Sequence, residues 1–439
     1  MIMKKRIMKL AGMCLFLLSV IIAGLNCQSD DSGDGFSLLN FSHLEHLTQE
    51  ISMNGRTVSI VKIYAEYPDY HTVEAEGEGI ACVDDVARAA ILYLRHYRYT
   101  REKTSLDRAR KMLNFLMAMQ APNGLFYNFI FADHSINKER VNSQPLADWW
   151  SWRAIWALAE GSEVYQEISP AFNDTLLSLI GKAIPAIDSL VQFYPQTETI
   201  AGLDLPQWLP YGSAADQAAV IVMALSLYQR STKNSQISGH INTLSEGILK
   251  MQRGDSLHFP WGCFLSWENI WHAYGNSQAY ALFKAAEISS TSLYHKRALR
   301  EVDYFYPFLL KEGMLSSFEV RPHANEYMMN EREDFSQIAY GIRPMVWASL
   351  EASRVTGQEK YSELAGEVAC WLLGKNAART PMYDPATGRC YDGINDPDSI
   401  NQNSGAESTI EALLSLLEIE QNSIAREIVH HYFRKMSTK

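Results

Sequence analysis

Acidic side chains recur along this chain where helices are expected to begin. Asp84 and Asp85 open the first such helix, and further acids stand near later helix starts, namely Asp148, Asp216, Glu268 and Glu407. Any helix N-terminus favours Asp or Glu, because its free N–H groups and positive dipole end attract negative charge, so one acid alone indicates little. Carboxylates gathered in one site can bind hydroxyl groups and exchange protons, which is the chemistry of general acid and base catalysis.

Aromatic side chains accompany these acids, which strengthens the case for a binding site. The aromatic candidates are Trp149, Trp150, Trp267, Trp271 and Tyr274. The remaining substrate-binding candidates are Asp148, Arg343, Tyr383 and Asn403. Sugar rings have an apolar face that stacks on an aromatic ring and a rim of hydroxyl groups that needs polar partners, so this mixture favours a carbohydrate ligand. Roughly half of the tryptophans are expected to fill the core instead.

Hydrolysis of a glycosidic bond needs one protonated carboxyl group and one ionised carboxylate. In the inverting reaction the two groups stand about 6.5–9.5 Å apart, which suits acids on opposite walls of a cleft. Asp84 or Asp85 would stand on one wall, and the facing acid would be Asp216, Glu268 or Glu407. Our assignment makes Asp85 the base and Glu407 the acid. Two structural roles stay open, since Asp84 can merely cap its helix and Glu407 can merely hold the loop before its own helix.

The elements that must position these residues are pairs of helices. Apolar residues recur at helical spacing in six successive pairs, each made of a helix rich in small residues and a more amphipathic partner. The first helices are expected at 83–99, 147–162, 214–230, 270–288, 336–355 and 404–418. Their partners are expected at 104–120, 170–193, 238–252, 292–310, 358–374 and 422–436. Six hairpins can close into a ring that gathers the starts of the inner helices, so we predict an all-α fold, an (α/α)6 toroid with short β segments in its loops.

The charge of the chain bears on its partners. The formal net charge is −11, and it becomes −15 once the four basic residues before Cys27 are removed. Nucleic acids bind surfaces rich in Lys and Arg, so an acidic body speaks against a nucleic-acid partner. A carbohydrate is the expected partner, and we expect a monomer.

The N-terminal segment is typical of a targeting signal. Basic residues precede a short apolar run at 13–24, which is too short for a comfortable membrane span. We interpret 1–26 as a lipoprotein-type signal peptide, with Cys27 as the lipidation site and plain secretion as the alternative. Residues 27–36 are polar and read as a flexible tether. The expected location is therefore the cell envelope, through a lipid anchor in the outer or cytoplasmic membrane, with residues 37–439 forming one toroid domain.

The cysteines give no sign of a zinc site. Cys82, Cys263, Cys370 and Cys390 would remain in the mature body, and none belongs to a CxxC or Cys/His cluster. An oxidising compartment permits a disulfide, but spacing does not reveal pairing, so a disulfide and free buried thiols stay equally open.

No cofactor or metal ion is expected. The chain has no Gly-rich phosphate loop and no dinucleotide-binding motif. The acids of one long loop could form an oxygen-rich calcium site, but ordinary turn acids are the favoured interpretation of Asp384, Asp392, Asp396 and Asp398.

Two stretches of sequence resemble a known family. The run 83–89, Val-Asp-Asp-Val-Ala-Arg-Ala, is similar to a helix start of the six-hairpin glycosidase superfamily, a group of bacterial carbohydrate enzymes. The runs 383–393 and 403–409 resemble the closing segment of the same domains, so the resemblance covers nearly the whole mature chain. It implies an (α/α)6 toroid that acts on carbohydrate, commonly by inverting hydrolysis.

The favoured function is therefore glycoside hydrolysis of a poly- or oligosaccharide, and two alternatives stay open. A polysaccharide lyase would need a Tyr or His base and a neutralising group for an acidic sugar, for which the chain offers Tyr211, His272, Tyr274, His323 and Arg343. A non-catalytic glycan-binding lipoprotein would use the aromatics for binding and the acids only as hydrogen-bond partners.

Overall fold

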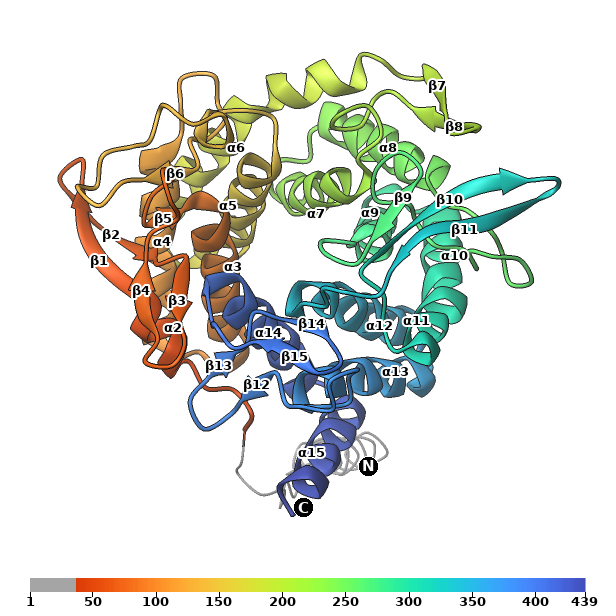
Figure 1. Ribbon diagram of the computed structural model, residues 1–439. Helices are drawn as coiled ribbons and strands as arrows, with labels where there is room; N and C mark the ends of the chain where they lie inside the picture. The colour runs from red at the N-terminus through yellow and green to blue at the C-terminus, as the bar shows by residue number, and fades with distance from the viewer. Residues whose placement is uncertain (1–36, 439) are drawn as a thin grey trace, which may run out of the picture. The chain divides into compact units, whose positions relative to one another are not determined.

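The computed structural model describes residues 37–438, and residues from Leu38 onward form one compact unit. An inner ring of helices surrounds its centre (Figure 1). The inner helices are α3 (Val83–Thr100), α5 (Trp149–Ile168), α7 (Ala215–Thr232), α9 (Gln278–Ser289), α12 (Arg343–Thr356) and α14 (Ala406–Glu420). Each contacts the next, and α14 contacts α3, so the ring is closed. The predicted all-α toroid of six hairpins is confirmed.

The outer helices follow their inner partners in the chain. They are α4 (Lys103–Met119), α6 (Pro170–Val191), α8 (Ser235–Lys250), α10 (Ser292–Arg300) continued by η2 (Glu301–Phe305) and α11 (Tyr306–Glu312), α13 (Glu359–Ala369) continued by η4 (Cys370–Leu373), and α15 (Ser423–Ser437). A further short helix, α2 (Ser42–Leu47), precedes the ring.

Side-chain size and polarity explain why one set of helices lies inside. Inner helices are apolar around most of their circumference, because each packs against two inner neighbours and an outer partner. In α7, for example, Ala215, Ala218 and Ala219 are fully buried, and such small side chains let helices approach closely. Outer helices bury one face only. In α4, for example, that face carries Met112 and Leu116, which are fully buried.

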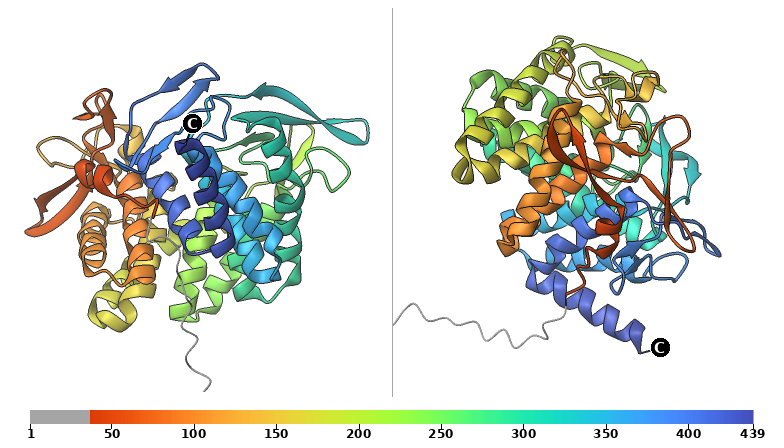
Figure 2. Two further views of the ribbon diagram at one scale, coloured as in Figure 1. Left: turned by 90° about the horizontal axis from the view of Figure 1, so that it is seen from below. Right: turned by 90° about the vertical axis from the view of Figure 1, so that its left-hand side faces the viewer.

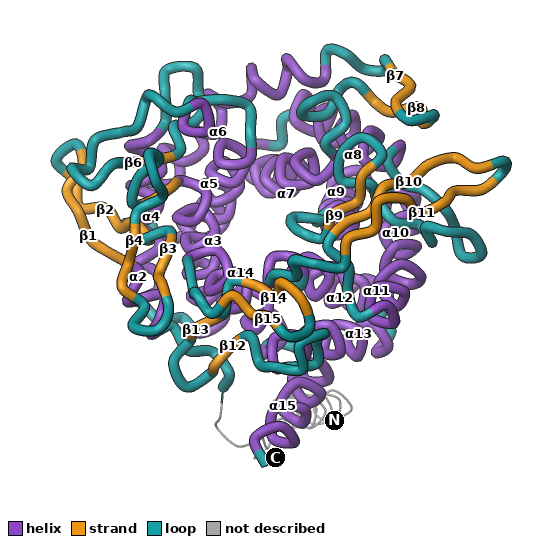
Figure 3. Tube along the Cα trace, in the orientation of Figure 1, coloured by secondary structure: helices purple, strands orange, loops and turns teal. Residues whose placement is uncertain are grey.

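The strands are short and gather at one end of the helical ring (Figures 2 and 3). They form antiparallel pairs: β1 (Thr48–Met53) with β2 (Arg56–Val61), β3 (Tyr64–Glu66) with β4 (His71–Val73), β5 (Ala81–Cys82) with β6 (Phe129–Ile130), β7 (Thr197–Ile200) with β8 (Leu203–Pro206), β12 (Tyr383–Asp384) with β13 (Arg389–Cys390), and β14 (Gly393–Asp396) with β15 (Ser399–Asn401). A three-stranded sheet has the order β11 (Glu326–Glu333), β10 (Ser317–His323), β9 (Ile270–His272). These strands precede or connect helices, so they shape the end of the ring at which the inner helices begin.

Two predicted inner helices begin later than expected. The fourth was expected from 270, but residues Ile270–His272 form β9 and the helix α9 starts at Gln278. The fifth was expected from 336, but α12 starts at Arg343 after the short 3-10 turn η3 (Ala339–Gly341). In β9, Trp271 packs against Phe305 and Phe318 in the core, so tertiary burial overrides the helical pattern.

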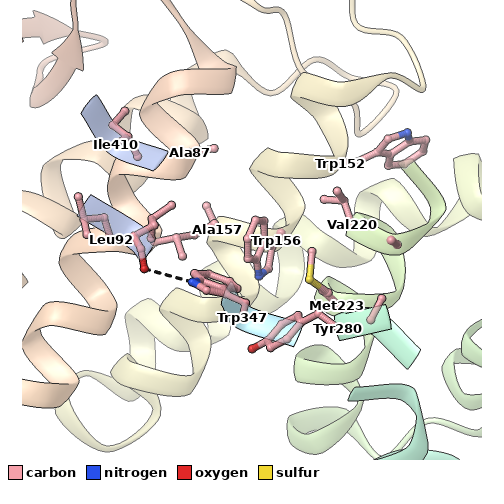
Figure 4. Packing of buried hydrophobic residues seen from close by; sticks show 14 of the residues in the cluster. Ala87, Leu92, Trp152, Trp156, Ala157, Val220, Met223, Tyr280, Trp347 and Ile410 are labelled. Carbon is pink, nitrogen blue, oxygen red and sulfur yellow. Dashed lines mark hydrogen bonds between the residues drawn. The ribbon is translucent and has the colours of Figure 1, made fainter. Parts of the chain in front are cut away.

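Buried aliphatic and aromatic side chains of the inner helices pack against one another inside the toroid (Figure 4). Trp347 donates a hydrogen bond from Nε1 to the carbonyl oxygen of Leu414 at 3.1 Å, and its ring meets that of Trp156 edge-to-face with centroids 5.9 Å apart. The guanidinium of Arg343 lies 4.8 Å from the centroid of Trp347. These stacked groups make the centre a packed core rather than an open channel.

Ion pairs occupy the far end of the ring, where the inner helices end. Arg95 donates hydrogen bonds to Glu160 at 2.5 Å and to Glu418 at 2.8 Å, which ties α3 to α5 and α14. The guanidinium also lies 3.9 Å from the ring centroid of Trp347. This end is therefore held by paired charges, while the opposite end carries the candidate acids.

The structure also bears on the cysteines and on membrane spans. Cys82, Cys263, Cys370 and Cys390 are all buried free thiols, so the disulfide alternative is not realised among the described residues.

Within 37–438, no helix combines the length and hydropathy that a bilayer crossing requires. The expected signal peptide (1–26), lipidation site Cys27 and tether (27–36) lie outside the described residues.

Truncation of an inner-helix leucine should destabilise the ring strongly. Leu413 of α14 is fully buried, whereas Leu257 is 80% exposed. Leu413→Ala should lower the free energy of unfolding by about 2–5 kcal/mol through lost burial and a residual cavity. The same change at Leu257 should cost less than about 0.5 kcal/mol. Urea denaturation of the two variants compares them, and equal losses would contradict the packing described.

Candidate active site

A cavity of about 340 Å³ lies where α3 and α14 begin, and we call it the carboxylate cavity. Its charged lining consists of Glu78, Asp84, Asp85, Arg88, Asp392 and Glu407. Tyr64, Phe129 and Tyr340 supply aromatic walls. Five carboxylates therefore share one cavity with one lining guanidinium, next to aromatic surfaces.

The start of α3 is positioned by the pairing of β5 with β6, a strand that follows α3 and α4 in the chain. Ala81 and Cys82 of β5 pair with β6, and the Val83 N–H donates to the Asn128 carbonyl oxygen at 2.7 Å. Cys82 then caps the helix, because its sulfur accepts a hydrogen bond from the Asp85 N–H at 3.4 Å. The strand pairing and the cap fix where α3 begins. Asp84 and Asp85, in its first turn, therefore line the cavity.

Arg88 is the centre of the charge arrangement. Only 2% of its side chain is exposed, and it pairs with carboxylates from two helices. Its Nη2 lies 2.6 Å from Asp85 and 3.5 Å from Asp84 on its own helix. Its Nη1 lies 2.9 Å from Glu407 and 3.3 Å from Glu411 on α14. One guanidinium therefore holds the first and last inner helices together through the candidate catalytic acids.

Two more buried arginines complete the arrangement. Arg153 of α5 pairs with Asp84 and donates to the Tyr340 hydroxyl at 2.5 Å. Arg343 of α12 lies 2.5 Å from Glu411, so this predicted substrate-binding residue holds a carboxylate rather than facing the cleft. Burial alone would raise the pKa of Asp84, but Arg153 and Arg88 hold it below its usual value. Asp84 is therefore an ion-pair partner and a poor proton donor.

Asp85 has the opposite electrostatic balance. Burial raises its pKa to about 6, the charges of Asp84 and Glu407 act in the same direction, and Arg88 opposes them. The Cys82 thiol donates to Asp85 Oδ2 at 3.2 Å. A carboxyl with a pKa near neutrality can both donate and accept a proton, which favours Asp85 as the proton donor, the reverse of the role assigned from sequence.

Glu407 is the more accessible acid of the pair. Its side chain is 44% exposed, and it lines the carboxylate cavity while its Oε2 contacts Arg88. Accessibility lets a carboxylate contact water and substrate, so its position fits activation of a water molecule. It does not hydrogen-bond the loop before its helix in the described structure, where Asp392 has that role.

Asp392 is a cavity carboxylate that the sequence interpretation treated as a turn acid. Its Oδ1 accepts hydrogen bonds from the Gly405 N–H at 2.8 Å and the Ser408 hydroxyl at 2.6 Å. Burial raises its pKa. Its place within the closing motif that resembles the glycosidase superfamily was the one signal that could have identified it. Within 37–438, no group of three or more His, Cys, Asp or Glu side chains is arranged to hold a metal ion.

Asp148 and Trp149 lie at the start of the next inner helix. Asp148 accepts hydrogen bonds from the Tyr211 hydroxyl at 2.5 Å and the Gln217 amide at 3.2 Å. The ring of Trp149 stacks on the guanidinium of Arg153 at 4.6 Å, and Arg153 in turn pairs with the cavity acid Asp84. Trp149 therefore connects to the carboxylate cavity through Arg153, whereas Asp148 contacts Tyr211 and Gln217.

Asp216 forms a separate pair with a histidine. It is almost fully buried, and its Oδ2 lies 3.0 Å from His272 Nε2. The His272 ring stacks on Tyr274 with centroids 3.8 Å apart. Tyr274 is exposed, and burial together with the charges of Asp216 and Glu407 raises its pKa.

Glu268 and Trp267 precede β9 in the chain and contact the residues just before α7. The Glu268 N–H donates to the Ser213 hydroxyl at 3.0 Å, and the Trp267 indole donates to the Tyr211 carbonyl oxygen at 3.4 Å. Both stand outside the carboxylate cavity. Exposed aromatic side chains near the starts of the inner helices are Tyr64, Tyr211, Trp267 and Tyr274. Together they offer stacking surfaces around the cavity.

Four predicted substrate-binding residues have other positions. Trp150 and Trp271 are buried in the core, which leaves them no face for a ligand, because neighbouring side chains cover their rings. Tyr383 is equally buried and donates to the Leu38 carbonyl oxygen at 2.9 Å. Asn403 accepts a hydrogen bond from the Tyr67 N–H at 3.0 Å, beside the cavity rather than in it. Arg343, described above, is likewise buried.

The titration of Asp85 tests these electrostatics. We expect its carboxyl carbon to titrate with a midpoint at about 6, because burial disfavours the charged form. Glu407→Gln should lower that midpoint, because it removes a nearby negative charge that raises the pKa. Carbon-13 NMR of aspartate-labelled protein measures both, with Asp85→Asn assigning the signal. A midpoint unchanged or raised by Glu407→Gln would contradict the arrangement.

Several solved structures share this fold. A cellobiose 2-epimerase from Bacillus thermoamylovorans B4167 is 12% identical and superposes with a TM-score of 0.57 over 82% of this chain and 92% of its own. A D-mannose isomerase is 14% identical, with a TM-score of 0.54 and coverages of 82% and 91%. A family 76 glycoside hydrolase from a bovine Bacteroides thetaiotaomicron strain is 12% identical, with a TM-score of 0.55 and coverages of 88% and 79%. No protein-family model and no curated protein sequence matches the chain. In fold, this chain is an (α/α)6 toroid, as the resemblance of its two motifs implied.

Proposed function

We propose that this chain is a carbohydrate-active enzyme, and specifically a glycoside hydrolase that acts in the carboxylate cavity. The observation that carries the proposal is the gathering of Asp85, Glu407 and Asp392 in one cavity with aromatic walls. Acid and base catalysis of glycoside hydrolysis requires two carboxyl groups in different environments, and Asp85 is buried whereas Glu407 is 44% exposed. The carbohydrate names of the structural neighbours support the same class of ligand.

The proposed reaction uses the two acids held by Arg88. Protonated Asp85 donates its proton to the glycosidic oxygen as the bond to the anomeric carbon breaks. Glu407 takes a proton from a water molecule, whose oxygen bonds to the anomeric carbon from the opposite face, which inverts its configuration. Arg88 touches both carboxylates and fixes their separation, so it acts as a positioning residue.

A sugar epimerase or isomerase is the second candidate, and the pairing of Asp216 with His272 favours it. Such an enzyme moves a proton at a carbon beside a carbonyl group, and a histidine oriented by a carboxylate suits that task. Two of the structural neighbours are named for this chemistry. The lyase alternative loses support, because an acidic sugar would enter a cavity lined by five carboxylates.

Substitution of the proposed catalytic acids should abolish turnover. Asp85→Asn and Glu407→Gln should each lower kcat about 10²–10⁴-fold, since each removes one proton-transfer group. Glu363→Gln, on the exposed face of α13, is the matched control and should retain full activity. The assay follows new reducing ends released from a panel of polysaccharides and oligosaccharides.

The products separate the candidate functions. Proton NMR shows the anomeric configuration of the newly formed reducing end. A configuration opposite to that of the cleaved bond would support the hydrolase. An isomeric sugar without bond cleavage, lost in His272→Ala and kept in Glu407→Gln, would contradict it in favour of the epimerase. Unsaturated products would indicate a lyase, and glycan binding that survives Asp85→Asn without any turnover in the wild type would indicate a binding protein.

We also propose that the chain is anchored in the cell envelope through Cys27. The basic start, the short apolar run and the polar stretch after the cysteine support this location. Expression in a bacterium with labelled palmitate should label the wild type and place it in the membrane fraction. Cys27→Ser should lose the label, and a Cys27→Ser variant that kept it would refute the anchor.

A further inference from the structure

A second cavity lies on the other side of the β3–β4 hairpin, and we call it the outer cavity. It holds about 640 Å³, against about 340 Å³ for the carboxylate cavity. Its lining includes the aromatic side chains of Tyr67, Tyr70, Tyr383, Tyr391 and Phe433. They come from the β3–β4 turn, the long loop before α14, and the end of α15. This volume falls in the range of small-ligand sites, which is about 300–1,000 Å³.

The two cavities share one thin wall. Tyr64 lines the carboxylate cavity and Tyr67, in the turn that follows the same strand, lines the outer cavity. On the other element of the wall, Tyr391 lines the outer cavity and the next residue, Asp392, lines the carboxylate cavity. Asn403 joins the two elements, because it accepts from the Tyr67 N–H at 3.0 Å and from the Asp392 N–H at 2.8 Å. The same two segments therefore separate the two cavities, with neighbouring side chains on either side of them.

The chemistry of the outer cavity suits a sugar better than a purely apolar ligand. Arg389 lies over the ring of Tyr70 at 4.5 Å, and its Nε donates to Thr387 at 3.0 Å. No hydrogen bond within the described part of the chain uses its two terminal nitrogens, so they remain available to hydroxyl groups. An apolar ligand would desolvate this charge without a partner, which is unfavourable. Tyr67, with 53% of its surface exposed, offers a stacking face beside these donors.

We propose that the outer cavity is a remote binding site for the glycan whose scissile bond lies in the carboxylate cavity. The substrate is then an oligo- or polysaccharide long enough to cross the wall formed by Tyr67, Asn403 and Tyr391. This proposal rests on the proposed function, because it takes the carboxylate cavity as the place of cleavage. It also assigns Tyr391 and Arg389 to substrate binding.

Dependence on substrate length tests the proposal. The mature chain with Cys27→Ser is assayed on neutral manno- and cello-oligosaccharides of increasing length. Tyr67→Ala should lower kcat/KM about tenfold on long substrates, the effect of losing one stacked contact, and change it by less than about twofold on the shortest one cleaved. Tyr304→Ala, which truncates a tyrosine 43% exposed on η2, is the matched control and should change neither. Equal losses on short and long substrates, or no loss on either, would overturn the proposal.

Affinity electrophoresis separates this proposal from the proposed function. The same chain is run through gels that contain mannan, soluble cellulose derivatives or other neutral polysaccharides. If the gel retards the protein, the retardation is lost in Tyr67→Ala and Arg389→Ala, and no polysaccharide is cleaved, the glycan site is supported and the proposed hydrolase function fails. If cleavage occurs at the same rate in Tyr67→Ala and Arg389→Ala as in the unsubstituted chain, the proposed hydrolase function stands and the proposed glycan site is overturned. No retardation in any gel, or retardation that arises only after residues before Ser37 are removed, also overturns it.

Discussion

One buried guanidinium, that of Arg88, supports both the architecture and the chemistry of this protein. Burying a charge is unfavourable unless it is paired, and Arg88 is paired with acids of α3 and α14 at once. These helices begin and end the ring, so the contact that closes the toroid also assembles the candidate active site. Loss of the guanidinium would leave the buried carboxyl of Asp85 without its ion-pair partner, whereas Glu411 would still be paired with Arg343.

The balance of charge around Arg88 explains why the acids differ. Three buried guanidinium groups, those of Arg88, Arg153 and Arg343, face a larger set of carboxylates, and their pairing is unequal. Asp84 receives a guanidinium of its own from α5 and stays ionised, whereas Asp85 shares Arg88 and holds its proton to a higher pH. Closing a ring of helices with shared ion pairs thus shifts the pKa values of two neighbouring acids in opposite directions.

Local patterns in the sequence predict much of this structure, and long-range contacts account for what they miss. Apolar periodicity located all six hairpins. The acids at the starts of α3 and α14 share one cavity, but they lie on adjacent helices and contact one guanidinium, whereas the sequence placed them on opposite walls. The pattern failed at Trp271, because a strand buried by distant Phe305 and Phe318 is locally indistinguishable from a helix start. The partners of Arg88 were also out of reach, since Glu407 lies 319 residues away in the chain.

The most direct test of the central claim is a crystal structure of the Glu407→Gln variant with an oligosaccharide bound. Our account predicts that a glycosidic oxygen lies within hydrogen-bond distance of Asp85, with the anomeric carbon facing residue 407 across a site for water. The sugar chain would continue toward Tyr67. A sugar bound beside His272 and Asp216, with the carboxylate cavity empty, would contradict the claim that Arg88 assembles the catalytic acids.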